Sequence, residues 1–207
     1  NYVALLGWSP GTTRVMFSLD ELSQCFTIEG INKAPAIFDI KKLSWLNGEY
    51  VRKLPVEEFN KLAVPYYKKA IKIENIDFMK ISKLLQVRTE VLSSIPENIG
   101  FFDRLPEYEK TLYIHKKMKT DTDISLASLK AALPVLEKLQ KWDETILHDT
   151  LINLASKMGI KNSQLLWPLR VAITGKEVTP GGAIEIASIL GKDETIKRVK
   201  AGIEKLS

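Results

Sequence analysis

Apolar residues recur every three to four positions along most of this chain, and no stretch alternates apolar and polar residues for long. Such spacing places the apolar side chains on one face of an α-helix. The clearest case is the segment that starts at Asp143, carries an apolar stripe from Ile146 to Met158 and stops at Gly159. Asp is a favoured residue at a helix start, and Gly is favoured just after a helix end. We therefore predict an all-α fold, which a sheet of three or more strands would contradict.

The composition excludes several classes of protein. The chain has 207 residues, enough for one large or two small domains with a core, and its 45% hydrophobic and 27% charged residues are ordinary for a soluble protein. No apolar run reaches the ~18 residues that a membrane span needs. The single Cys25 leaves no internal disulfide, and two histidines make a structural zinc site improbable. We expect a cytoplasmic monomer that does not bind membranes.

Local signals place several elements. Ser18 and Glu21 have the spacing of a capping box. We predict a helix over residues 77–92, and we interpret Trp45 and Tyr50 as core residues. The connector at residues 104–108 indicates a domain boundary.

Positive charge is modest and uneven. The net charge is +5, and residues 61–90 carry seven basic against three acidic side chains. A solvated surface and a phosphate-facing surface both fit this excess. The lysines that we assign to the second interpretation are Lys68, Lys72 and Lys83 here, and Lys176 further on.

One arginine stands inside an apolar segment. Residues 163–174 predict a helix that ends at Gly175, and Arg170 lies among its apolar residues. An unpaired buried charge is costly, so Arg170 either meets a carboxylate or points toward an anionic or base-like partner. A planar fork of five donors suits a nucleobase edge or a phosphate. The residues alone leave both interpretations open.

Two blocks of the sequence resemble a known family. The block Pro168-Leu169-Arg170-x-Ala172-x-Thr174-Gly175-Lys176, followed by Thr179-Pro180-Gly181 and Leu190-Gly191-Lys192, is similar to the anticodon-binding end of bacterial glutamyl-tRNA synthetases. Residues 5–10 and 38–52 resemble the stem-contact region of the same family. The order and spacing of both blocks match, so the resemblance covers essentially the whole chain.

The resemblance implies a domain order and a parent enzyme. It implies the end of a stem-contact region at 1–54, a first anticodon-binding subdomain at 55–107 and a second at 108–207. Because Asn1 is not a natural start, we expect a fragment of a longer glutamate–tRNA ligase, which attaches glutamate to tRNA(Glu) with ATP and magnesium. The fragment has neither the His-Ile-Gly-His motif nor the lysine loop of that class. We therefore expect no catalytic residue and no cofactor in it, and no ATP-dependent activation of glutamate by it alone.

The resemblance also implies which residues contact tRNA. The residues that would line the anticodon base pockets are Arg88, Arg170, Thr179 and Pro180. Trp167 would either stack on a base or fill the core. Gly181 and Gly182 would let the backbone approach the RNA closely, although the family often has a larger residue in place of Gly182. Arg88 would meet the third anticodon base and favours a cytosine. We expect both arginines to be partly accessible and to face the same side of the molecule.

Two alternatives remain open. The motif residues could serve packing in a helical protein-interaction module that has no RNA specificity. A parent enzyme of this family could also charge tRNA(Gln). The salt dependence of binding distinguishes a protein-interaction module from an RNA-binding module, because phosphate contacts make RNA affinity fall steeply with ionic strength.

Overall fold

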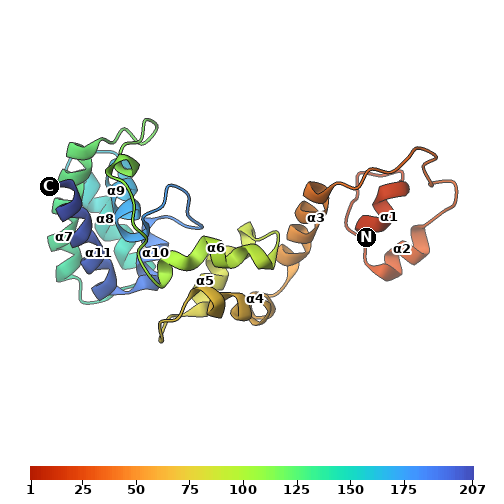
Figure 1. Ribbon diagram of the computed structural model, residues 1–207, viewed down its shortest axis with the longest axis horizontal. Coiled ribbons are helices and arrows are strands. Elements are labelled where there is room, and N and C mark those ends of the chain that lie inside the picture. The colour runs from red at the N-terminus through yellow and green to blue at the C-terminus, as the bar shows by residue number, and fades with distance from the viewer.

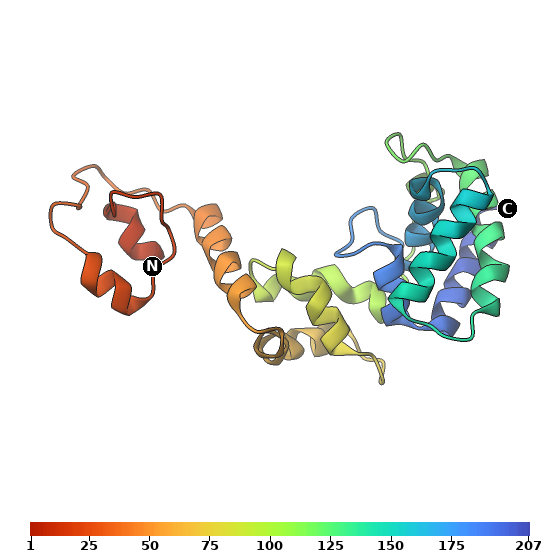
Figure 2. The same cartoon turned by 180° about the vertical axis from the view of Figure 1, so that it is seen from behind.

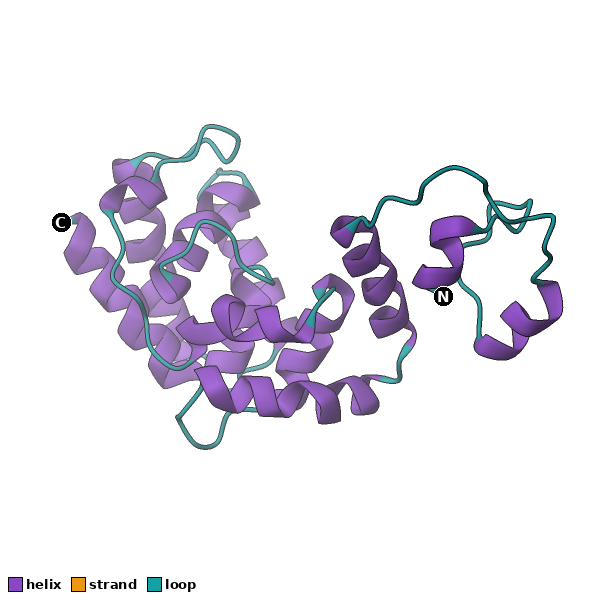
Figure 3. Cartoon of the chain, turned by 45° about the vertical axis from the view of Figure 1, so that its right-hand side comes forward, coloured by secondary structure: helices purple, strands orange, loops and turns teal.

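The computed structural model describes all 207 residues. Its regular secondary structure is helical, apart from two isolated β-bridges in the loops. The prediction of an all-α fold is confirmed (Figure 3). The chain is elongated: a small N-terminal piece lies at one end, α3 leads to a middle layer of α4 to α6, and a bundle of α7 to α11 forms the other end (Figures 1 and 2). No helix combines the length and the apolar character needed to cross a bilayer.

The N-terminal piece holds α1 (Tyr2–Gly7) and α2 (Leu19–Cys25), and α3 (Ile40–Lys53) follows. The predicted capping box is confirmed, because the Glu21 N–H donates to Ser18 Oγ at 3.1 Å and the Ser18 N–H donates to the Glu21 carboxylate at 2.7 Å. The interpretation of Trp45 and Tyr50 as core residues is wrong: they are 42% and 39% exposed. Both lie on α3, which stands alone between the N-terminal piece and the middle layer, so no bundle encloses its sides (Figure 1).

The middle layer contains α4 (Val56–Ala70), α5 (Phe78–Leu85) and the short α6 (Ile95–Ile99). The helix predicted over 77–92 is too long. The α-helix ends at Leu85 and continues as a single 3₁₀ turn, Gln86–Arg88. Thr89 then adopts an extended conformation, and its hydroxyl donates to the Leu85 carbonyl at 3.0 Å, which takes the acceptor that a continuing helix would use.

The bundle contains α7 (Thr122–Lys138), α8 (Glu144–Lys157), α9 (Asn162–Thr174), α10 (Ala183–Leu190) and α11 (Lys192–Leu206). Helix α9 packs against the other four helices of the bundle, which explains why apolar residues occupy nearly every face of α9. Asp143 caps α8 as predicted, since its carboxylate accepts from the Ile146 N–H at 2.9 Å.

The sequence offers Asn162 or Ser163 as the cap of α9 and Asp193 as the cap of α11, but both helices begin slightly earlier. Helix α9 starts after Lys161, whose N–H donates to the side-chain oxygen of Gln164 at 3.0 Å, rather than at a cap on Asn162 or Ser163. Helix α11 starts after Gly191 and not at Asp193. The Gln164 side chain thus accepts a hydrogen bond at the start of α9, whereas no side chain caps α11.

A single hydrophobic core runs from Val51 to Val199 and joins the middle layer to the bundle. Buried in it is Arg198, which is 2% exposed and which the sequence analysis overlooked. Its Nη1 donates to the carbonyls of Phe101 and Ile173, both at 2.7 Å, and its Nε pairs with Glu194 at 2.7 Å. One side chain thus connects the end of the middle layer, α9 and α11. The boundary at 107 and 108 stays a prediction, and core side chains lie on both sides of it.

Replacing Arg198 by Ala should lower the free energy of unfolding by about 2–4 kcal/mol, because two buried carbonyls lose their donor. The measurement is urea denaturation followed by circular dichroism. The matched control is Lys197→Ala, whose side chain is 78% exposed and pairs with the same Glu194. This control should change stability by less than about 0.5 kcal/mol. Equal losses in the two variants would contradict the role assigned to Arg198.

Candidate nucleic-acid interface

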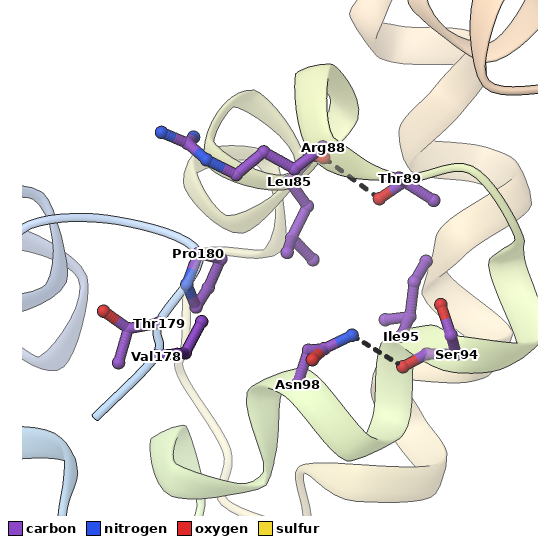
Figure 4. Close-up of a pocket in the computed structure, with 9 residues that line it drawn as sticks. All are labelled: Leu85, Arg88, Thr89, Ser94, Ile95, Asn98, Val178, Thr179 and Pro180. Atoms are coloured by element: carbon purple, nitrogen blue, oxygen red, sulfur yellow. Dashed lines mark hydrogen bonds between the residues drawn. The ribbon is translucent and has the colours of Figure 1, made fainter. Parts of the chain in front are cut away.

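A hollow of about 170 Å³ lies where the middle layer meets the loop between α9 and α10 (Figure 4). We call it the central hollow. It brings together Arg88, Thr179 and Pro180, three of the residues that the sequence analysis placed in base pockets. Its complete lining is Leu85, Arg88, Thr89, Ser94, Ile95, Asn98, Val178, Thr179 and Pro180. Segments separated by about 90 positions in the sequence therefore share one small site.

The loop that carries Thr179 and Pro180 is held in place by its two ends. Gly175 ends α9 with φ +63°, the left-handed region that favours glycine. At the other end, Gly181 lies so close to α5 that an added Cβ would be 2.6 Å from Leu84 Cδ1. The Thr179 hydroxyl donates to the Gly181 carbonyl at 2.7 Å, which closes the turn. The loop is thus fixed against the same helix that leads to Arg88.

Arg170 lines a second hollow, of about 320 Å³, together with Gly182 at the end of this loop. Its guanidinium stands 4.5 Å above the Trp167 ring, its Nη2 donates to the Glu177 carbonyl at 2.8 Å, and its Nε is buried without a partner. Burial lowers the pKa of Arg170 from its usual value, and the nearby carboxylate of Glu177 opposes this change. No carboxylate forms an ion pair with Arg170, so the interpretation as a closed structural pair is wrong.

The expectation that both arginines are partly accessible is confirmed, since Arg88 is exposed and Arg170 is half-buried. Their hollows are neighbours. Arg88 lines a third hollow, of about 420 Å³, together with Glu185, and Glu185 also lines the hollow of Arg170. The third hollow is lined by Lys80, Lys83, Leu84, Arg88, Glu144, Glu185 and Ile189. That the two arginines face one side of the molecule stays a prediction.

Trp167 has little surface left for a base. It is 6% exposed, its Nε1 donates to the Leu112 carbonyl at 3.0 Å, and its ring lies 4.1 Å from that of His115. Arg170 covers the ring as well. Of the two interpretations considered for Trp167, its position favours the core, from which it supports the Arg170 guanidinium.

The two glycines of the loop differ. Gly182 lines the hollow of Arg170, and its φ of −79° suits any residue. An added Cβ there would approach only the flexible Glu185 carboxylate, at 2.8 Å. Gly181 is buried against Leu84, so its close backbone contact is with α5. This corrects the expectation that Gly181 lets the backbone approach RNA.

The predicted backbone lysines lie in three places. Lys68 and Lys72 are exposed at the end of α4 and just after it, where Lys72 Nζ donates to the Lys68 carbonyl at 2.7 Å. Lys83 lines the third hollow beside Arg88. Lys176 donates to the Glu97 carbonyl at 2.8 Å and lines a different hollow beside residues 100–107. Only Lys83 therefore shares a hollow with a predicted base-reading residue.

Lys80, Asn98 and Glu185 are among the polar residues that line the hollows and that the sequence analysis did not assign to the site. Lys80 was visible within the basic stretch, but nothing separated it from its neighbours. Asn98 and Glu185 occupy ordinary helical positions. No local signal identifies them, because the hollows form between segments that are distant in the sequence.

Comparison with known proteins now bears on the site. The sequence model of one protein family, described as the anticodon binding domain, matches residues 58–203 of this chain. The chain belongs to this family. It is 58% identical over 206 residues to a glutamate–tRNA ligase of Clostridium tetani and 53% identical to that of Clostridium kluyveri; each match covers all of this chain and 42% of the relative. The chain thus spans less than half the length of these curated relatives.

A solved structure is similar to this chain over nearly its whole length. The crystal structure of a glutamate tRNA ligase from Elizabethkingia meningosepticum, in complex with its amino acid, matches 99% of this chain and 40% of that one, with a TM-score of 0.83 at 25% identity. The resemblance identified in the sequence is confirmed by both kinds of comparison.

Gly181→Ser should lower the free energy of unfolding by about 1–3 kcal/mol, because the new Cβ would overlap Leu84. The matched variant Gly182→Ser should be neutral or stabilising. Serine is a favoured helix N-cap, and Glu185 lies three residues on, as a capping box requires. Thermal denaturation of both variants tests this, and equal destabilisation would show that the contact with Leu84 does not fix the loop.

Proposed function

We propose that this chain is the anticodon-reading segment of a glutamate–tRNA ligase, a cytoplasmic monomer whose remaining part attaches glutamate to tRNA(Glu) with ATP and magnesium. One observation carries the proposal. In a chain of the anticodon-binding family, Arg88 and the Thr179-Pro180 turn share a hollow, and Arg170 lies in the next one. The similarity to glutamate–tRNA ligases over all of the chain supports the choice of tRNA.

The state of Arg170 suits a ligand that brings hydrogen-bond acceptors. Its Nε has no partner, and a buried donor without one costs free energy. The Trp167 ring and the Glu177 carbonyl hold the guanidinium in one orientation before any ligand arrives. Anticodon bases are unstacked and expose their pairing edges, which offer the acceptors that an arginine fork needs.

The third hollow suits a phosphate of the RNA backbone. Three cations, Lys80, Lys83 and Arg88, and two carboxylates, Glu144 and Glu185, line it, and none of the cations pairs with an acid. Unpaired cations in a concave site attract phosphates without regard to base sequence. Lys68, Lys72 and Lys176 would contact the RNA backbone at other places on the molecule. The family match does not favour the alternative of a protein-interaction module.

Arg170→Ala and Arg88→Ala should each weaken binding of tRNA(Glu) by about 1–3 kcal/mol, the usual scale of a bidentate contact to a base. The loss should shrink when the base that the arginine reads is changed, because that contact is then already absent. The measurement is equilibrium binding of transcripts with the cognate anticodon and with single-base changes.

Lys83→Ala is the matched control for these arginine variants. It should weaken all RNAs alike and lower the slope of affinity against salt. A transcript of tRNA(Gln) in the same assay tests whether a second tRNA is bound. If Arg170→Ala weakens every anticodon equally, Arg170 does not read a base.

A further inference from the structure

Asn98 is the one carboxamide in the lining of the central hollow. It is exposed on α6, across the hollow from the turn that carries Thr179 and Pro180 (Figure 4). The floor of the hollow is apolar, since Leu85 and Ile95 are both buried there. A flat ring that lay on this floor would present its polar edge to the groups at the rim.

The orientation of the Asn98 amide is fixed by the backbone. Its Nδ2 donates to the Ser94 carbonyl at 3.0 Å. The opposite orientation would place Oδ1 against that carbonyl oxygen, acceptor against acceptor, and is therefore disfavoured. Figure 4 shows the nitrogen turned toward Ser94 and the oxygen turned toward the side of Val178. Asn98 thus offers the hollow an acceptor, Oδ1, while its amide nitrogen is engaged.

An acceptor of fixed orientation distinguishes the pyrimidines. Cytosine carries an exocyclic amino group at C4, which donates, whereas uracil carries a carbonyl at the same position, which only accepts. Against uracil, Oδ1 would face a second acceptor. Arg88 comes from the side of the hollow opposite Asn98, and its side chain extends outward in Figure 4. A turn of this exposed side chain toward the hollow would bring donors that suit the O2 and N3 acceptors of cytosine.

We propose that Asn98 is a specificity-determining residue: its Oδ1 accepts a hydrogen bond from the 4-amino group of a cytosine held in the central hollow, and so selects cytosine over uracil. This inference rests on the proposed function, and it adds a residue that acts on the base directly. The size of the hollow agrees, because about 170 Å³ is below the roughly 300–1,000 Å³ of pockets for larger ligands and suits one ring.

The experiment measures binding of anticodon stem–loop RNAs to the full chain, with C, U or the 4-deamino analogue pyrimidin-2-one at each anticodon position. The unmodified protein should prefer C to both others by about tenfold at one position, the effect of one well-placed hydrogen bond. In Asn98→Ala, C should bind no better than pyrimidin-2-one at that position. The control Glu97→Gln, on the same helix but outside the hollow lining, should keep the preference.

The analogue tests the proposal without any change to the protein. If the unmodified protein binds pyrimidin-2-one as well as C at every position, the amino group is not read and the inference is overturned. A preference that survives in Asn98→Ala, or an equal loss for all RNAs in that variant, overturns it too. These outcomes leave the proposed function standing, provided that other anticodon changes still alter affinity. If no anticodon change alters affinity, the proposed function fails as well.

Discussion

The rest of the structure depends on the buried guanidinium of Arg198. The last carbonyls of any helix lack partners within that helix. Arg198 supplies donors to two such groups at once, Phe101 at the end of the middle layer and Ile173 in the last turn of α9. Its Nη1 donates to both carbonyls while Nε, held in the same plane, pairs with Glu194, whereas a lysine would have to reach all three acceptors with one nitrogen. The joint between the layers is therefore a directional contact as well as an apolar one.

The position of the joint explains why the residues proposed to recognise the anticodon lie where they do. The loop that carries Thr179 and Pro180 begins just after Ile173, and α6, which carries Asn98, leads directly into Phe101. Both rims of the central hollow are thus close in sequence to the two carbonyls that Arg198 holds. A site that reads single bases needs its groups fixed within fractions of an ångström. Here the two rims come from different layers, so that precision depends on a rigid contact between them.

The sequence predicted much of the fold and part of the site. Asp143 and the capping box at Ser18 were recognisable because caps act over three or four residues. The resemblance led to Arg170 because the block that carries it is contiguous in the sequence, and it implied a role for Arg88 as well. It did not lead to Arg198 or Asn98, whose roles arise from partners in other segments. Trp45 and Tyr50 were misassigned because an aromatic residue on an amphipathic helix does not show how many neighbouring elements enclose that helix.

The first helices stand outside the shared core, whose first member is Val51. They are attached to α3 through a few hydrogen bonds, such as those of the Tyr2 hydroxyl with Asp39 and of the Tyr50 hydroxyl with the Phe17 carbonyl. Few buried apolar contacts mean a low free energy of local opening. The chain is accordingly not one cooperative unit: amide protons before α3 should exchange with solvent well ahead of those in α9. The denaturant slope of the main transition should then reflect the surface of a shorter protein.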